Sequence, residues 1–215
     1  MDVTAKVTRA ALRRHVLPVL RESGFDDGTP SRLWRHRDGH IGVIALETYS
    51  TYRALTDQCT TASFTVRLGI SPANYSVLDN RFHAEYVKLG PKGPRPDEAA
   101  MPIRGVLCPS DAPALSMGRW GWEYVSMWRV DTPDDAEDRA ADLASQLADY
   151  GLDWLTRGWD GAEIAAPLDR DEMDPMLISR PNGSHLRLDA GGKGTPLRDE
   201  CLSMLRRGSD RDAQR

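Results

Sequence analysis

The sequence contains few cysteines and no long apolar run. Its 215 residues include three widely spaced cysteines, Cys59, Cys108 and Cys201, and no Cys-x-x-Cys pair. This odd count argues against a disulfide framework and favours reduced thiols in a cytoplasmic protein. No apolar stretch approaches the ~18 residues that a membrane span requires, and the N-terminus lacks the layout of a signal peptide. We therefore expect no membrane association.

Sequence signatures of catalysis are also missing. There is no Gly-x-Ser-x-Gly, no dinucleotide-binding glycine pattern and no phosphate-binding loop, since the glycine spacing in Gly191–Thr195 is wrong for one. The acidic run Asp169–Asp174 lacks the glycine and the terminal glutamate of a calcium loop. Cys59 has no adjacent basic residue that would lower the pKa of its thiol. The sequence thus gives no catalytic residue, cofactor or metal site, and favours a non-enzymatic protein without deciding it.

The composition is that of a globular protein with uneven charge. Hydrophobic residues make up 40% and charged residues 28%, and the net charge is −4. Residues 1–24 are rich in basic side chains, whereas residues 131–149 are rich in acidic ones. Such asymmetry can mark a surface that binds a partner, but we favour two solvated helix faces of opposite sign.

A β-hairpin is the most informative local feature. Asp38-Gly39 separates Arg32–Arg37 from His40–Tyr49, and this dipeptide is a strong signal for a two-residue turn. In that register Arg37 pairs with His40 and Leu33 with Ile44 on one face, together with Arg35. Trp34 and His36 lie on the other face. The return strand is apolar on both sides, so we expect it inside a sheet.

Further strands follow the hairpin. Ser63–Ile70 alternates between apolar and polar residues, which is typical of an antiparallel strand with one buried face and places Arg67 on the other face. Glu85–Leu89, Ile103–Cys108 and Trp122–Val130 are the other strand candidates. The segment Gly90–Pro96, rich in glycine and proline, is predicted to be a loop.

Two helices frame these strands. The first is expected over Thr4–Ser23, with Gly24 as its C-terminal glycine and Pro18 as a residue that kinks or divides it. The second begins after Thr132 as N-cap, carries an apolar stripe to Tyr150, and is expected to end at Gly151.

These elements predict an α+β fold. We expect an antiparallel sheet of about five or six strands, packed on one face by the N-terminal and the C-terminal helix. Residues 1–157 would form the single domain. Residues 158–215 are highly charged and then rich in glycine, and are expected to form a loosely structured, partly disordered C-terminal extension.

The order of these elements resembles an uncharacterised bacterial family, domain of unknown function 4304. The segments that carry the resemblance span about residues 8–157 and are Leu20–Phe25, Trp34–His36, Phe64–Ile70, Trp120–Trp128 and Gly151–Leu155. One stretch departs from the family. Glu47–Ser50 stands where the family has a glutamine followed two residues later by a serine. The family has no assigned activity, so the resemblance implies a fold and no function.

Histidine and arginine residues near the hairpin turn are the candidate binding residues. His36 and His40 have a spacing used by metal sites on helices, but the turn between them puts the two rings on opposite faces of the hairpin. Arg35, Arg37 and His40 share one face of the hairpin instead, Trp34 lies on its other face, and Arg67 is placed on the exposed face of the third strand. We take these five as a possible anion or partner footprint. Nucleic acid is the less favoured ligand because the isoelectric point is about 5.7.

The spacing of the tryptophans has two interpretations. Trp120, Trp122 and Trp128 are separated by even numbers of residues, so a continuous strand would place them on one side, either in the core or at an interface.

The favoured function is a cytoplasmic binding protein whose partner is another protein, with toxin neutralisation (an immunity-type role) as one version. The alternative is an enzyme with a dispersed site on the open sheet face; its candidate residues are His36, Glu47, Tyr49 and Arg67.

Overall fold

The fold is known from a computed structural model of the chain. It describes residues 3–71, 73, 87–98, 101, 103–111, 127–156, 176–179 and 185–188. Several predictions from the sequence fall outside these residues: the start of the strand candidate at 122–126, the tryptophans at 120 and 122, and most of the C-terminal extension. Within the described residues no helix is both long and apolar enough to cross a membrane.

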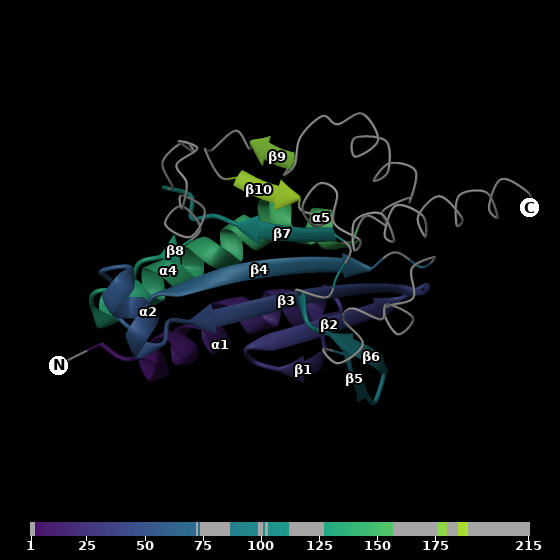
Figure 1. The fold of residues 1–215 in the computed structure, drawn as a ribbon, viewed down its shortest axis with the longest axis horizontal. Coiled ribbons are helices and arrows are strands. Elements are labelled where there is room, and N and C mark those ends of the chain that lie inside the picture. The colour runs from purple at the N-terminus through teal and green to yellow at the C-terminus, as the bar shows by residue number, and fades with distance from the viewer. Residues whose placement is uncertain are drawn as a thin grey trace, which may run out of the picture.

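An antiparallel sheet forms the centre of the molecule, and the predicted α+β class is confirmed (Figure 1). In chain order its strands are β1 (Asp27–Thr29), β2 (Arg32–Arg37), β3 (His40–Thr48), β4 (Phe64–Ser71), β7 (Ile103–Leu107), β8 (Met127–Trp128), β9 (Met176–Ser179) and β10 (His185–Leu188). The spatial order is β1-β2-β3-β4-β7-β10-β9, and β8 pairs with β4. The sheet is larger than expected because β1, β9 and β10 join the predicted strands.

The hairpin between β2 and β3 has the predicted register. Arg37 lies opposite His40 and Leu33 opposite Ile44. Asp38 and Gly39 both have positive φ, at 51° and 79°, as a two-residue turn of this kind requires. β3 is an interior strand, as predicted, because β4 pairs along its other edge and brings Leu68 opposite Ile44.

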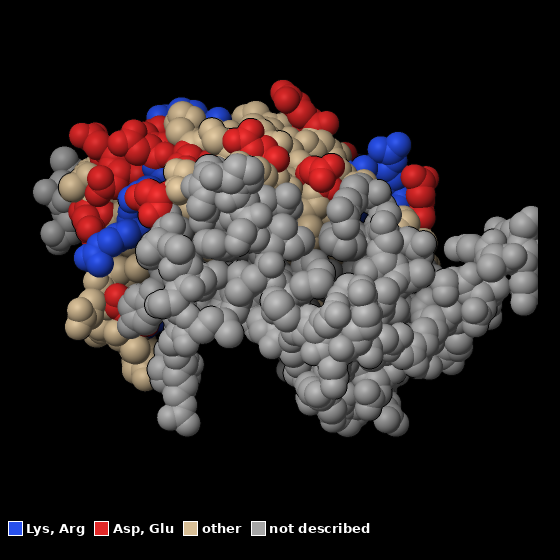
Figure 2. All heavy atoms as spheres, turned by 90° about the horizontal axis from the view of Figure 1, so that it is seen from above, with Lys and Arg blue, Asp and Glu red and all other residues tan. Residues whose placement is uncertain are grey.

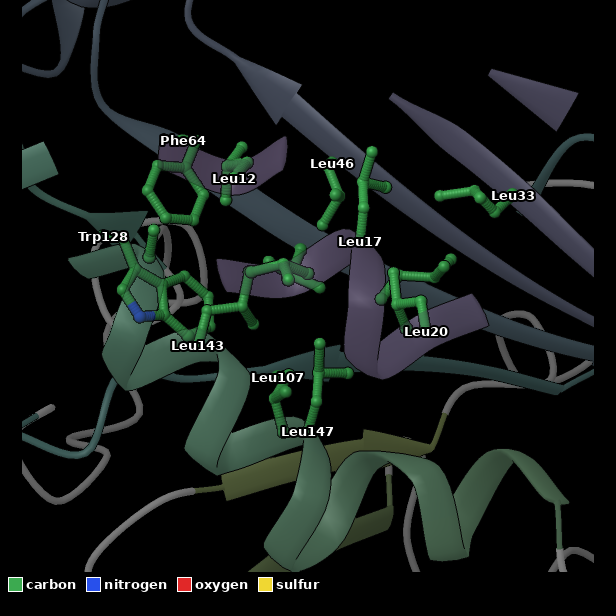
Figure 3. Packing of buried hydrophobic residues seen from close by; sticks show 14 of the residues in the cluster. Leu12, Leu17, Leu20, Leu33, Leu46, Phe64, Leu107, Trp128, Leu143 and Leu147 are labelled. Atoms are coloured by element: carbon green, nitrogen blue, oxygen red, sulfur yellow. The ribbon is translucent and has the colours of Figure 1, made fainter. Parts of the chain in front are cut away.

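Helices cover one face of the sheet. α1 (Ala5–Glu22) and α4 (Pro133–Gln146) pack against each other on that face (Figure 1). The core between helices and sheet includes large buried side chains from both layers: Leu12, Leu17, Leu20, Leu33, Leu46, Phe64, Leu107, Trp128, Leu143 and Leu147 (Figure 3). Trp128 stacks on Phe64, with ring centroids 5.5 Å apart, so the one described tryptophan of the 120–128 segment lies in the core.

The two helices meet with opposite charges. Arg14 donates to Glu137 across the helix interface at 2.8 Å, and His15 lies 2.8 Å from the same carboxylate. Pro18 is exposed on α1 and lies inside a single helix, so it does not divide the helix as the sequence suggested. Gly24, with φ at 86°, ends the helix as predicted.

The prediction that Gly151 ends the last helix is wrong. α4 begins with the expected cap, since Thr132 accepts from the backbone of Asp135 and Asp135 accepts from the backbone of Thr132. The chain then passes through a π-helical turn (Leu147–Gly151) into α5 (Leu152–Thr156). An added Cβ at Gly151 would lie 3.0 Å from the side chain of Leu147 and 3.4 Å from that of Leu107, so this glycine packs closely against its neighbours within a helix that continues.

The prediction of a loop over Gly90–Pro96 is also wrong in part. β5 (Val87–Gly90) and β6 (Gly93–Pro96) form a separate two-stranded sheet, which we call the β5–β6 hairpin. Proline is tolerated there because each of these strands has an unpaired edge. Contacts with the main sheet, described below, hold the hairpin in place, and the local sequence does not reveal them.

Two strands of the predicted C-terminal extension belong to the sheet. β10 pairs with β7 through Leu186 opposite Leu107, and β9 pairs with β10. The remainder of residues 158–215 lies outside the described residues. The division into a domain and an extension therefore stays a prediction.

A short helix completes the described elements. α2 (Thr51–Thr56) follows β3 directly, and Ser50 caps it by accepting a hydrogen bond from the backbone of Arg53 at 3.2 Å. Ala54 is its buried residue. The opposite side of α2 faces outward.

Candidate binding groove

The five predicted binding residues do not form one patch. Trp34 and Arg67 project from the face of the sheet opposite the helices, which we call the open face, whereas Arg35, Arg37 and His40 project from the helix-covered side. The separation follows from strand alternation and the confirmed register. The footprint that the sequence suggested is therefore divided between two sides of the sheet.

The three residues on the helix side lie beside the hairpin turn and the end of α1. Arg37 is exposed and lies 3.3 Å from Asp38 in the turn. Arg35 packs beside Gly24, where an added Cβ would come within 3.3 Å of its Nε, and burial lowers the pKa of its guanidinium. His40 and His36 lie on opposite faces of the hairpin, so their spacing, which suits a metal site on a helix, does not bring the two rings together here. Nor does any group of three His, Cys, Asp or Glu side chains among the described residues suit a metal ion.

A groove of about 1120 Å³ lies at the edge of the sheet formed by β1 and β2. Arg9, Leu12 and Arg13 of α1 contribute to it from the helix side, and Arg32, Trp34 and Glu47 contribute from the open face. The start of α2 supplies Ser50 and Arg53. Lys88, Leu89 and Arg95 of the β5–β6 hairpin, followed by Asp97, also line it.

The lining of the groove is basic although the chain is acidic overall. Its charged side chains are six cations, Arg9, Arg13, Arg32, Arg53, Lys88 and Arg95, and two carboxylates, Glu47 and Asp97. The net charge of the whole chain is −4. The acidic side chains gather elsewhere: Figure 2 shows them over the helix layer, where α4 exposes Asp134 and Asp138.

Arg32 neutralises both carboxylates of the groove. Its guanidinium donates to Asp97 at 2.7 Å and to Glu47 at 3.1 Å, and it lies 3.0 Å from Glu98. Arg67, behind it on β4, lies 3.7 Å from Glu47 and 3.8 Å from Glu98. The acidic groups of the groove are therefore already paired within the protein.

Three cations of the groove have no carboxylate partner among the described residues. Arg9 donates to the Thr48 hydroxyl at 3.2 Å, and Arg13 and Lys88 have no ion pair. Arg9 and Arg13 are four residues apart on α1, a spacing at which like charges destabilise a helix by about 0.2–0.5 kcal/mol. Uncompensated positive charge thus lies on both the helix wall and the hairpin wall.

Glu98 is the carboxylate with the most unusual environment. It is only 4% exposed, and burial raises its pKa to about 7, with a hydrogen bond to Asp97 acting in the same direction and Arg32 acting against it. Groups with pKa values near neutrality are frequent at functional sites. Glu98 lies behind Arg32 and does not itself line the groove.

A second cluster fastens the β5–β6 hairpin to the open face. Arg95 makes a two-pronged ion pair with Asp27, and its guanidinium lies over the Trp34 ring. His36 Nε2 lies 3.3 Å from the same carboxylate. Asp27 is buried, and the Arg95 hydrogen bond holds its pKa below the usual range.

Two further contacts complete this attachment. The Trp34 indole donates to the Pro96 carbonyl at 2.7 Å, and Lys92 donates to Asp26 at 2.6 Å. Apolar packing adds to them, because Val87 lies against a small cluster that includes Val43 and Met101. Trp34, predicted as a binding residue, thus supports one wall of the groove.

The residues of the enzyme alternative do not converge on this groove. Of His36, Glu47, Tyr49 and Arg67, only Glu47 lines it. His36 pairs with Asp27, and Tyr49 is buried beneath the Arg53 guanidinium, 4.7 Å from the ring centre. Burial also raises the pKa of the Cys59 thiol, which makes that cysteine less reactive at neutral pH.

Sequence reasoning missed most of the groove. Arg9 and Arg13 carried a local signal, a like-charged pair at helical spacing with no acidic residue between them. Arg53, Lys88 and Arg95 carried none, because tertiary folding brings them together from separate elements.

Comparison with known proteins adds no assignment. No family model, no curated protein and no solved structure matches the chain. The resemblance to domain of unknown function 4304 therefore stays a prediction.

Proposed function

We propose that the protein is a non-enzymatic, cytoplasmic binding protein that captures another protein through the basic groove. The observation that carries the proposal is the excess of cations in the groove of an acidic chain. Arg32 pairs with both lining carboxylates, and Arg9, Arg13 and Lys88 have no carboxylate partner among the described residues, so these three cations are available to a ligand. Residues that line the groove replace the divided five-residue footprint as the binding surface.

Electrostatics supports an anionic ligand. A concave surface of one sign concentrates the potential and accelerates association with a partner of the opposite sign. Guanidinium groups also bind carboxylates through paired hydrogen bonds, which adds directional specificity. Arginines outnumber lysines in the groove, five to one. A ligand rich in carboxylates fits this chemistry.

Toxin neutralisation is one concrete version of this function. An immunity-type protein needs only to cover a functional surface of its toxin, and the protein itself performs no chemistry. A single domain with a charged groove suits such a role. The resemblance of the chain to domain of unknown function 4304, if it reflects kinship, is compatible with this role, because that family has no assigned activity.

A second candidate is an enzyme on the open face, favoured by Glu98. Its pKa of about 7 suits a general acid or base at neutral pH. Two guanidiniums, of Arg32 and Arg67, lie within 3.0 and 3.8 Å of its carboxylate. Burial weighs against this role, since a catalytic group must reach its substrate.

Binding of a labelled polyglutamate peptide tests the binding function. We expect the full chain to bind it at low ionic strength, and the double variant Arg13→Glu/Lys88→Glu to bind about tenfold more weakly, because two unpaired attractions become repulsions. Fluorescence anisotropy measures both affinities. Arg21→Glu is the matched control: Arg21 is exposed on the same helix, lies outside the groove and forms no ion pair among the described residues.

The outcomes separate the ligand classes. Loss of affinity in the groove variant with retention in the control supports the proposal. Equal affinity in all three proteins, or no binding to any, contradicts it. Tighter binding of a single-stranded oligonucleotide than of polyglutamate, with a steep salt dependence, would overturn protein as the partner class.

A further inference from the structure

Exposed apolar side chains on two elements that contribute to the groove narrow the class of its ligand. Among the described residues, three large apolar side chains are more than three-quarters exposed: Tyr52 at 82%, Leu89 at 78% and Leu55 at 76%. Leu89 lines the groove on the hairpin wall. Tyr52 and Leu55 belong to α2, whose Arg53 and cap residue Ser50 line it as well.

The two residues on α2 share one exposed side. They are three positions apart, so their side chains are neighbours on the helix surface, and they lie away from the buried Ala54. Single exposed apolar residues are common on protein surfaces. Here, however, all three described examples come from the two elements that flank one groove.

We propose that the groove docks an acidic, amphipathic segment of a partner protein, whose carboxylates face Arg9, Arg13 and Lys88 and whose apolar side chains cover Tyr52, Leu55 and Leu89. This inference rests on the proposed function and specifies its ligand. Charge complementarity selects the acidic residues, and the exposed apolar side chains select the apolar ones.

The apolar contacts also favour a polypeptide over nucleic acid. Both polymers are polyanions and both satisfy an arginine-rich groove. Nucleic-acid surfaces offer bases that stack on aromatic rings, whereas they offer little that matches an aliphatic side chain. Two of the three exposed residues are leucines. Leucine and valine side chains of a partner provide the complementary surface.

Two peptides of equal net charge test this inference on the full chain. One is polyglutamate, and the other has leucines interspersed among the same number of glutamates. We expect the leucine-containing peptide to bind about tenfold more tightly, because it buries the exposed apolar side chains of α2 and of the β5–β6 hairpin. In Tyr52→Ser/Leu55→Ser most of this advantage disappears, with Leu89 left in place, while affinity for polyglutamate is unchanged. The conservative variant Tyr52→Phe/Leu55→Met retains the advantage.

The result distinguishes failure of the inference from failure of the proposed function. If both peptides bind the natural chain with equal affinity, the apolar part is overturned and the binding function stands. If neither peptide binds, both are overturned. If the serine variant loses affinity for both peptides equally, Tyr52 and Leu55 do not contribute through apolar contact and the inference fails.

Discussion

The two faces of the central sheet use the same strands for different purposes. On the helix-covered face, side chains of β3 and β4 such as Ile44 and Leu68 are completely buried. On the open face, neighbours on the same strands, Glu47 and Arg67, enter a network of ion pairs beside the groove. The helix-covered face holds the fold together mainly by apolar packing, whereas the open face combines a smaller apolar cluster with ion pairs at the surface.

Leu68→Ala should have the largest effect. Leu68 is completely buried among the residues between sheet and helices, so its truncation is expected to lower the free energy of unfolding by about 2–5 kcal/mol. Its neighbour Arg67 lies on the open face and is 37% exposed, and Arg67→Ala is expected to destabilise much less. Urea denaturation of both variants measures the difference. Equal losses would remove the distinction between the faces.

Asp27→Asn tests the attachment of the β5–β6 hairpin. Removing this buried charge leaves Arg95 without its partner and is expected to cost about 2–4 kcal/mol at pH 7. Because the folded-state pKa of Asp27 is lowered, its contribution is present above the ordinary value of 3.8 and is lost as pH falls further. Denaturation of natural and variant chains across this range measures it.

The adjacent residue supplies the control for that change. Asp26 pairs with Lys92 at 2.6 Å, but both side chains are about half exposed. Asp26→Asn should therefore have a clearly smaller effect than Asp27→Asn. Comparable effects of the two variants would mean that burial of Asp27 adds nothing to the attachment.

Glu98→Gln should stabilise the protein at pH 8. The pKa of Glu98 is raised from 4.5 to about 7, so the folded state holds an extra proton in that window and stability falls as pH rises through it. Glutamine does not ionise, so the variant lacks this decline and should be more stable at pH 8 by about 1–3 kcal/mol. Thermal unfolding at pH 5 and pH 8 measures it. A variant less stable than the natural chain at pH 8 would show that the Arg32 pairing outweighs burial.

Thr132→Ala should have the smallest effect, on the helix layer. Thr132 accepts a hydrogen bond from the backbone of Asp135, and its loss is expected to cost about 1 kcal/mol. Thr4→Ala is the matched control, because Thr4 occupies the same position in α1 but makes no side-chain cap bond. Chemical denaturation compares the two. A larger loss in Thr4→Ala would contradict the role of the cap.

The parts of the fold that were predictable are those with local causes. The Asp38-Gly39 turn determines the hairpin register, and strand alternation then places Leu68 and Arg67 on opposite faces. The cap of α4 is likewise encoded within a few residues. Pattern and turn chemistry act over short distances, so a single sequence reveals them.

The parts that were missed depend on contacts between distant segments. Gly93–Pro96 forms a strand because Arg95 and Pro96 are bound by Asp27 and Trp34, more than 60 positions earlier in the chain. Gly151 lies within a helix that continues to Thr156 and packs against Leu147 and, on β7, Leu107. The groove combines α1, α2 and the hairpin, and no local pattern predicts that its cations share one surface.

Residue-resolved NMR of the full chain titrated with polyglutamate tests the binding groove most directly. We expect backbone amide shifts to change at groove residues, such as Arg13, Arg53 and Lys88, and to stay constant at Asp134 and Asp138 on α4. Changes confined to residues outside the groove, or no change at saturating peptide, would contradict it.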